Sequence, residues 1–375
     1  MDRVIFEPAL ALGRLLRERK LGSRELLDLC WAQVEKHNPR INAVIYVDIE
    51  RAGKSADAAD RRLKEGAPLS PFDGVPMTAK ESFDWTGTPS TWGTPRFKDN
   101  IAQSDAVALR RLLDAGAVMF GKTNVPLMLA DWQSFNDVYG VTNNPWDISR
   151  APGGSSGGSA AALASGMSAL EIGTDIGASI RNPAHYCGVY GHKPTFGIVP
   201  MRGQSPPDVV TPSDISVAGP LARSARDVGA MVDLLAGPDI IEARGYRLSL
   251  PADERELGEL RVAVMSNDPV SEVDRPVEDL ILSLAEWLGP RVRHLSTSAR
   301  PAFSMREAMD LYVTLLRAAT SRRQSDEEFA ANAERVRAFA ADDHGYFSTM
   351  MRAYVMPHRA WLFANERRHQ LRLLW

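Results

Sequence analysis

The chain has 375 residues, and its 44 lysine and arginine side chains against 47 aspartate and glutamate side chains give a net charge of −3. Hydrophobic residues make up 44% and charged residues 24%, values typical of a globular protein rather than of a disordered, collagenous or coiled-coil chain. Because the charge is balanced, neither a nucleic acid nor an anionic membrane surface is an expected partner.

Cysteine content and hydropathy bear on the location of the protein. Two cysteines, Cys30 and Cys187, are too few for a disulfide framework, which is typical of a reducing compartment. The first residues lack the basic and apolar regions and the cleavage site of a signal peptide. The sequence contains no run of 18 uncharged apolar residues that could span a membrane. These features predict a soluble, cytoplasmic protein with no membrane partner.

The N-terminal part, residues 8–66, is predicted to be helical. A first helix is expected to have its N-cap at Ser23 and to end at Pro39, because apolar side chains recur between them at helical spacing. A second helix is predicted from residue 49 to Gly66, which is a typical C-terminal glycine.

From residue 67 to residue 237 short apolar runs alternate with helical stretches, a pattern that predicts a layered α/β domain. The expected strands cover residues 72–80, 117–120 and 169–173, and the expected helices cover residues 104–116 and 159–168.

Residues 238–375 are predicted to be mostly helical. Helices are expected over residues 270–289, 304–320, 326–341 and 360–375, with short strands over residues 260–267 and 291–297. The last of these helices reaches Trp375 without the glycine, asparagine or proline that usually stops a helix, which is unusual for the end of a complete domain.

Glycine and serine are concentrated in two segments. Residues 153–158 consist only of these two residue types and precede an alanine-rich helix, which favours a loop of close backbone approach over a flexible linker. Residues 173–179, with the sequence GTDIGAS, place small residues before Ser179. Consecutive backbone N–H groups can then face one point, as an oxyanion hole requires.

A serine becomes a nucleophile only when a base takes its proton. Two histidines, His185 and His192, lie near the serine-rich segments, but Ser179 has no G-x-S-x-G motif around it, which disfavours an ordinary α/β-hydrolase. A lysine with a depressed pKa can act as the base instead. Lys80, at the end of a predicted strand, is the candidate.

Four motifs in this order make the sequence resemble the amidase signature family of Ser-Ser-Lys hydrolases. They are GVPMTAKESFDWTG, GKTNVPLMLADWQSFNDVYGVTNNPWD, PGGSSGGSAAALASG and GTDIGASIRNPAHYCGVYGHKPT. The resemblance implies a single amidase signature domain over residues 1–375, an α/β/α sandwich whose mixed central sheet is covered by helices on both faces. Residues 1–66 would form N-terminal helices, 67–237 the core with the catalytic site, and 238–375 a mostly helical, incomplete C-terminal part.

The resemblance also implies roles for individual residues. Lys80 would be the catalytic lysine, Ser155 the bridging serine after a cis peptide bond, and Ser179 the nucleophile that accepts the acyl group. The oxyanion hole would consist of the backbone N–H groups of Ile176, Gly177, Ala178 and Ser179. Supporting positions would be Ser156, Asp175 and Arg181, and substrate-binding positions would be Gln133 and Asn136, for which loop-capping hydrogen bonds are the alternative.

One residue departs from the family pattern in the nucleophile loop. Ala178 stands where many family members have glycine. Its methyl group is tolerable if the backbone angle φ there is negative and is a problem if φ is positive.

The implied activity is hydrolysis of a small carboxylic amide to an acid and an amine or ammonia, without a metal or an organic cofactor. The small amide is the expected partner, and a homodimer is left open. One alternative is the glutaminase (A) subunit of a tRNA-dependent amidotransferase, but NPAHYCG and GHKPTFG stand where those subunits typically have QPAAFCG and GLKPTYG. The other is an inactive, truncated amidase-like binding protein.

Two further patterns are given structural interpretations. Residues 116–123 match the P-loop pattern, but their apolar centre predicts a buried strand and Pro126 disfavours a following helix, so Lys122 is interpreted as a strand-end lysine. His185, Cys187 and His192 do not have the spacing of a standard zinc site, so no metal site is predicted.

Overall fold

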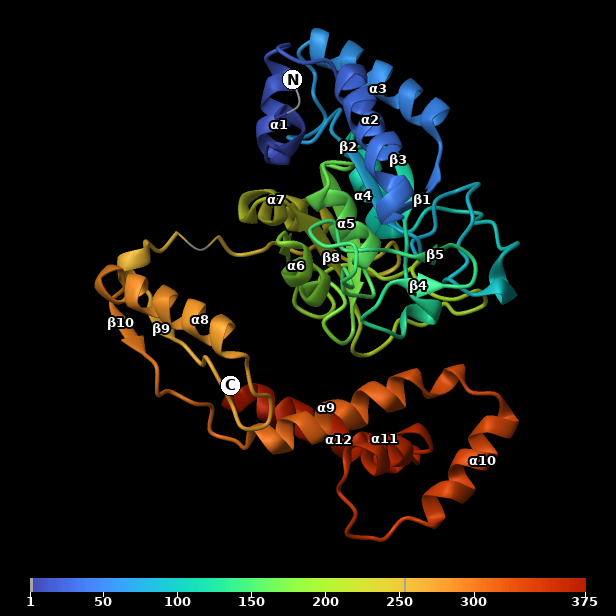
Figure 1. Ribbon diagram of the computed structural model, residues 1–375, viewed down its shortest axis with the longest axis vertical. Helices are drawn as coiled ribbons and strands as arrows, with labels where there is room; N and C mark the ends of the chain where they lie inside the picture. Colours follow the sequence, from blue (N-terminus) through green and yellow to red (C-terminus); the bar gives the residue numbers. More distant parts are fainter. Residues whose placement is uncertain (1–2, 253) are drawn as a thin grey trace. The chain divides into compact units, whose positions relative to one another are not determined.

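The computed structural model describes residues 3–252 and 254–375. The chain separates into two compact units, one that ends at Leu250 and one that begins at Pro251 (Figure 1). The single-domain organisation that the sequence suggests stays a prediction.

A mixed six-stranded sheet forms the centre of the first unit (Figure 1). In spatial order its strands are β1 (Val44–Val47), β3 (Val118–Thr123), β2 (Pro76–Lys80), β6 (Leu170–Asp175), β8 (Val217–Ala222) and β7 (Tyr190–Gly191). Strand β2 is parallel to both β3 and β6, whereas the pairs β1–β3, β6–β8 and β7–β8 are antiparallel. A separate antiparallel pair consists of β4 (Phe135–Asn136) and β5 (Gly140–Val141).

Helices cover the sheet. The helices of this unit are α1 (Ala9–Arg17), α2 (Ser23–Ile41), α3 (Ile49–Lys64), α4 (Val107–Asp114), α5 (Gly157–Ala164), α6 (Arg181–Cys187) and α7 (Ala225–Leu235). Helix α5 contacts β1, β2, β3, β6 and β8, while α3 packs on β3 and α7 packs on β8. Every residue of β2, β3, β6 and β8 is buried, as expected for strands between two helical layers. The predicted α/β/α sandwich is confirmed.

Local predictions for the first long helix were wrong at both ends. Ser23 is inside α2, and its N–H donates to Asp60 of α3 at 2.6 Å, so a side chain from the neighbouring helix satisfies the helix start. The helix continues past Pro39 to Ile41, and Asn42, with φ of 55°, is its C-cap. Gly66 follows α3 with φ of 71°, as predicted.

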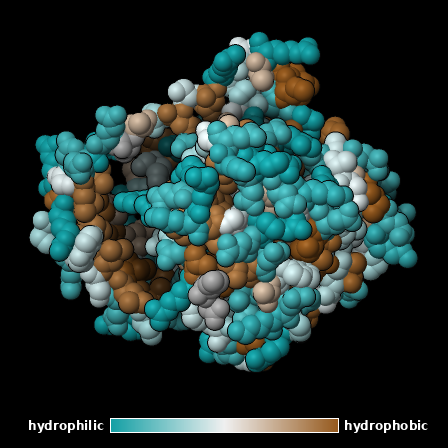
Figure 2. Space-filling model, turned by 90° about the horizontal axis from the view of Figure 1, so that it is seen from above, coloured by the Kyte–Doolittle hydropathy of each residue, from teal (hydrophilic) through white to brown (hydrophobic). Residues whose placement is uncertain are grey.

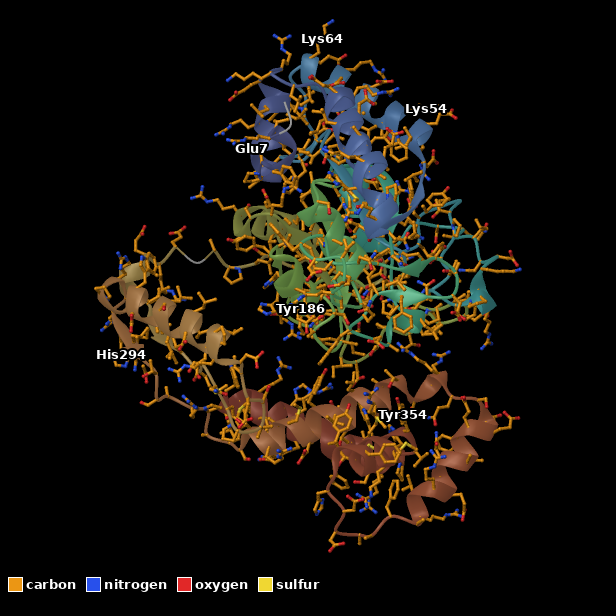
Figure 3. All side chains as sticks on the ribbon, viewed as in Figure 1. Glu7, Lys54, Lys64, Tyr186, His294 and Tyr354 are labelled. Carbon is orange, nitrogen blue, oxygen red and sulfur yellow. The ribbon has the colours of Figure 1, made fainter. Side chains whose placement is uncertain are left out.

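The second unit is mostly helical, as predicted. Its helices are α8 (Arg275–Leu288), α9 (Met305–Thr320), α10 (Asp326–Arg337), α11 (Tyr346–Tyr354) and α12 (His358–Leu374). Strands β9 (Arg261–Ala263) and β10 (His294–Ser296) pair in parallel. Figure 3 labels His294 on β10 and Tyr354 at the end of α11.

Hydrophilic residues cover much of the face shown in Figure 2, with hydrophobic residues in smaller patches between them. No helix in the described parts of the chain is both long and apolar enough to span a bilayer.

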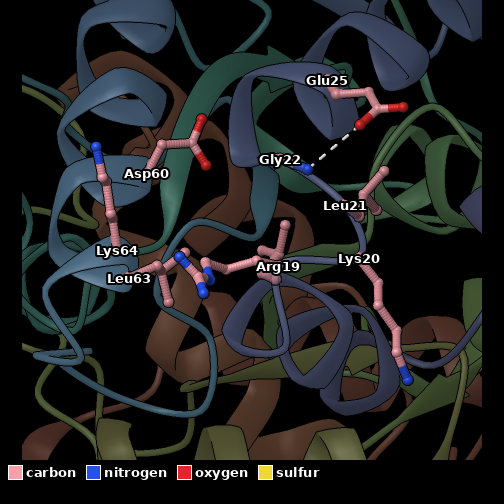
Figure 4. A pocket seen from close by; sticks show the side chains of 9 residues that line it. Arg19, Lys20, Leu21, Gly22, Glu25, Asp60, Leu63 and Lys64 are labelled. Atoms are coloured by element: carbon pink, nitrogen blue, oxygen red, sulfur yellow. Dashed lines mark hydrogen bonds between the residues drawn. The ribbon is translucent and has the colours of Figure 1, made fainter.

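A surface pocket of about 310 Å³ lies against α1, α2 and α3 (Figure 4). Its lining includes Arg19, Lys20 and Lys64 together with the carboxylates of Glu25 and Asp60. None of the predicted catalytic residues lines it, so the pocket is separate from the site that the sequence indicates.

Candidate active site

Lys80 is the last residue of β2, and its side chain is fully buried. Its Nζ lies 2.6 Å from Ser155 Oγ and 2.9 Å from Thr174 Oγ1. The parallel pairing of β2 with β6 brings the carboxyl ends of both strands to one edge of the sheet, where α/β proteins commonly bind ligands. The lysine therefore ends among hydroxyl groups at this edge.

Burial lowers the pKa of Lys80 to about 7, against the charge of Asp175, which favours the ammonium form. A large fraction of the side chains therefore carries a neutral amine at neutral pH. A neutral amine can accept the Ser155 hydroxyl proton across the same 2.6 Å contact.

We expect the rate at which a fluorophosphonate labels Ser179 to rise with pH and to reach half its maximum near pH 7. Below the pKa of Lys80, which is about 7, the ammonium cannot take a proton, and above it the neutral amine can. The measurement is the second-order labelling rate between pH 5 and pH 9, at pH values where the protein stays folded. The residual labelling of Lys80→Met should show no inflection near pH 7, and a flat wild-type profile would remove Lys80 from the role of base.

The glycine–serine segment brings the chain into close contact with its surroundings. The peptide bond between Gly154 and Ser155 is cis, as the resemblance implies. Ser155 is 1% exposed and stands just before α5. A Cβ atom at Gly154 would lie 2.5 Å from the Asp131 carbonyl oxygen, and one at Gly157 would lie 2.3 Å from Ser134 Oγ. Glycine is therefore required by close approach, as the composition predicts.

Ser179 lies in the loop between β6 and α6 and is 4% exposed. The Ser156 N–H donates to the Ser179 carbonyl oxygen at 3.1 Å, and Ser156 Oγ contacts the backbone of Thr174. The structure therefore brings Lys80 and Ser155 into direct contact and places the backbone of Ser179 next to that of Ser156, the residue after Ser155.

Asp175, at the end of β6, organises the loop that carries Ser179. Its carboxylate accepts two hydrogen bonds from the Arg181 guanidinium, at 2.9 and 3.0 Å, and one from the Ile180 N–H at 3.1 Å. Burial by itself would raise the pKa of Asp175, but Arg181 and these backbone donors hold it below its ordinary value. The charged carboxylate thus holds the loop of Ser179 through its bonds to Arg181 and to the Ile180 N–H.

The peptide unit between Gly177 and Ala178 is held at both ends. The Ala178 N–H donates to Asp175 Oδ1 at 2.9 Å, and the Gly177 carbonyl oxygen accepts from Trp132 Nε1 at 2.8 Å. Because the carboxylate engages the Ala178 N–H, we correct the expected oxyanion hole by leaving this donor out. Ile176, Gly177 and Ser179 are the remaining expected donors.

Ala178 has φ of 71°, in the left-handed region that glycine adopts far more readily than alanine. We expect Ala178→Gly to raise the free energy of unfolding by up to about 1 kcal/mol, since alanine there costs about 1–2 kcal/mol and glycine costs some folding entropy. Urea unfolding measures the change. As a control, Ala58→Gly within α3 should lower the free energy by about 1 kcal/mol. A lower free energy of unfolding in Ala178→Gly would contradict the inference that the backbone at Ala178 is strained.

The two expected substrate-binding residues differ in their surroundings. Asn136 is buried, its Nδ2 donates to Asn124 and Val125, and its Oδ1 accepts from Val138 and Tyr139. These hydrogen bonds favour the alternative interpretation of Asn136, in which its side chain caps a loop instead of binding the substrate. Gln133 is half-buried and directly follows Trp132, so it alone of the two keeps a place in the proposed site.

The P-loop interpretation fails, as predicted. Residues 118–123 form the buried strand β3, and Lys122 Nζ contacts the Pro89 carbonyl oxygen and lies 3.0 Å from Ser90 Oγ. Lys122 is thus a buried strand-end lysine rather than part of a phosphate-binding loop.

His185 and Cys187 lie in α6, whereas His192 follows β7. Cys187 is buried at the end of this helix, where its Sγ lies 3.4 Å from the Pro152 carbonyl oxygen. Within the described residues there is no group of three His, Cys, Asp or Glu side chains arranged to hold a metal ion.

Sequence reasoning missed two residues of the site. Thr174 contacts Lys80, and its only signal is its position inside the GTDIGAS motif. Trp132 contacts the nucleophile loop from a segment 45 residues away, and no local pattern indicates such a contact.

Comparisons with known proteins agree with this geometry. The sequence model of the Amidase family matches residues 25–371. The chain is 34% identical over 336 residues to human fatty-acid amide hydrolase 2, an alignment that covers 84% of this chain and 61% of the relative. It is 36% identical over 303 residues to a glutamyl-tRNA(Gln) amidotransferase subunit from Halorhodospira halophila, and this alignment covers 74% and 62% of the two chains.

A solved structure also matches. The structure of 6-aminohexanoate cyclic dimer hydrolase complexed with substrate superimposes with a TM-score of 0.76 at 30% sequence identity, over 98% of this chain and 76% of that one. The mixed sheet between two layers of helices is therefore the amidase signature fold.

This chain belongs to the amidase signature family. It spans about three-fifths of the length of the two curated relatives. Its activity, substrate and partners are therefore taken up as proposals.

Proposed function

We propose that this chain hydrolyses a small carboxylic amide to an acid and an amine or ammonia, with Ser179 as the nucleophile and Ser155 and Lys80 as its proton relay. The observation that carries this proposal is the contact of 2.6 Å between the buried Lys80 Nζ and Ser155 Oγ, beside the loop of Ser179. The pKa of about 7 for Lys80 supports the role of base.

The proton path follows from this arrangement. Neutral Lys80 takes the proton of the Ser155 hydroxyl while Ser155 takes that of Ser179, whose oxygen then bonds to the amide carbonyl carbon. As the C–N bond breaks, the proton returns through Ser155 to the leaving nitrogen. Water attacks the acyl-enzyme by the same relay, which releases the acid and restores the Ser179 hydroxyl.

The negative charge that develops on the carbonyl oxygen needs nearby donors. We assign this role to the backbone N–H groups of Ile176, Gly177 and Ser179, in the loop that Asp175 and Arg181 support. One such donor contributes about 2.7–4 kcal/mol to the transition state in a serine hydrolase. Gln133 is proposed to contact the substrate.

We also propose a reducing, cytoplasmic location for this chain. The thiols of Cys30 and Cys187 are free and buried, which supports it.

The test combines turnover with labelling. A panel of small amides is assayed for release of acid and amine. After fluorophosphonate treatment, intact-protein mass gives the number of labels and peptide mass mapping identifies the modified serine. We expect one label at Ser179 and hydrolysis of at least one amide without added metal or cofactor. A label elsewhere, or no label on folded protein, would overturn the proposal. Glutamate release from glutamine only with an added protein would instead identify an amidotransferase component.

A further inference from the structure

Trp132 stands where the two serine loops meet. Its Nε1 donates to the carbonyl oxygen of Gly177, two residues before Ser179, at 2.8 Å. On the other side, a Cβ atom at Gly154, the residue before Ser155, would lie 3.0 Å from the Cα of Trp132. One residue therefore adjoins both the bridging serine's loop and the nucleophile's loop.

The side chain of Trp132 has a fixed orientation but is exposed to solvent. The residue is 59% exposed, whereas Ser155 and Ser179 are 1% and 4% exposed, and residues 176–178 between them are half-buried. Because the indole N–H is tied to Gly177, the ring has a defined orientation, and its apolar surface is left without a partner that would exclude water. A substrate that reaches Ser179 past residues 176–178 passes this ring.

We propose that Trp132 is a specificity-determining residue whose ring stacks against an aromatic group bonded directly to the scissile carbonyl. This inference rests on the proposed amidase function. The hydrogen bond to Gly177 places the ring beside the loop proposed to hold the carbonyl oxygen, and we assign the acyl side of the amide to it. Stacked or edge-to-face aromatic pairs are stabilised by more than the burial of their apolar surface. A saturated ring of the same size gains only the burial and not this additional stabilisation.

Two substitutions separate the ring from its hydrogen bond. Trp132→Phe keeps an aromatic face and loses the donor to Gly177, so it should keep the preference for an aromatic acyl group even if kcat falls. Trp132→Leu removes both, so the preference should fall. The control is Trp146→Leu, because Trp146 is also exposed, at 74%, and its Nε1 also donates to a carbonyl oxygen, that of Cys187, at 2.8 Å.

The experiment compares benzamide with cyclohexanecarboxamide, which differ in the aromaticity of a ring of equal size. The ratio of their kcat/KM values should fall about twofold to tenfold in Trp132→Leu relative to the wild type, and stay unchanged in Trp132→Phe and Trp146→Leu. The change in the ratio between variants cancels the different intrinsic reactivity of the two amides. A purely structural role of Trp132 would lower both values together and leave the ratio unmoved.

A second readout does not require turnover. Phenylboronic and cyclohexylboronic acid add reversibly to a serine oxygen, and their protection of Ser179 from a fluorophosphonate gives the same aromatic-to-saturated ratio. Ratios that are equal in wild type and Trp132→Leu, with Ser179 labelled in both, would overturn this inference and leave the proposed function standing. Absence of labelling in folded wild type would overturn both.

Discussion

Replacing Lys80 by methionine is expected to lower kcat and the rate of Ser179 labelling by at least about 10³-fold, by analogy with the loss of a base from a catalytic unit. The amine lies 2.6 Å from Ser155 Oγ, and burial lowers its pKa to about 7, so it is poised to accept the proton at neutral pH. Methionine has a similar length and fills the buried space without a charge, which keeps the packing of β2.

The matched control is Lys122→Met, because Lys122 is a second buried lysine near the end of the adjacent strand β3. Its burial also lowers its pKa, to about 8, but its Nζ contacts Ser90 and not Ser155. We expect this variant to lose stability and to retain labelling, per folded molecule, within about tenfold, as for a group outside the relay. Equal losses per folded molecule in the two variants would contradict a specific role of Lys80 as the base.

Replacing Ser179 by alanine should abolish fluorophosphonate labelling and remove most of the amide hydrolysis, a loss of the order of 10⁴-fold or more in kcat, as found when a nucleophile leaves a serine hydrolase. Ser155→Ala should behave differently. It keeps the nucleophile and breaks the relay to Lys80, so labelling should continue at Ser179 and slow by about 10²–10⁴-fold, the usual contribution of a positioned proton-transfer group.

Ser165→Ala is the control for these serine variants. Ser165 is also buried, but it caps the C-terminal end of α5, the opposite end of the helix from Ser155, and its Oγ donates to the Ala161 carbonyl oxygen. Labelling and turnover should be unchanged in this variant. Undiminished labelling of Ser179→Ala would exclude Ser179 as the nucleophile, and undiminished labelling of Ser155→Ala would exclude the relay.

Several elements could be predicted from local sequence because their cause is local. The apolar spacing of α9 and the glycine after α3 depend only on residues close together in the sequence, and the structure confirms both elements. Strands β1 and β8 were missed, since β1 is a run of only 4 residues within a helical region and β8 contains a proline and a glycine. Their pairing with β3 and β6 makes them strands.

The same distinction explains the errors at single residues. Serine is a residue type that commonly caps helices, but in α2 the side chain of Asp60 from α3 accepts the hydrogen bond of the Ser23 N–H at the helix start. For Asn136 the sequence left both substrate contact and loop-capping hydrogen bonds open, and its amide bonds to Asn124 and to the backbone around it. In each case a partner distant in the chain competes for the hydrogen bond, and local patterns carry no information on such partners.

The residues of the proposed site could be identified from the sequence itself, because a lysine at the end of an apolar run and two serines among glycines are local features of the chain. The pKa of Lys80 and the contact between Trp132 and Gly177 were decided only by the tertiary structure. Burial, which lowers the pKa of Lys80 to about 7, and the clamp of Trp132 on Gly177 both arise when segments tens of residues apart pack together and exclude water.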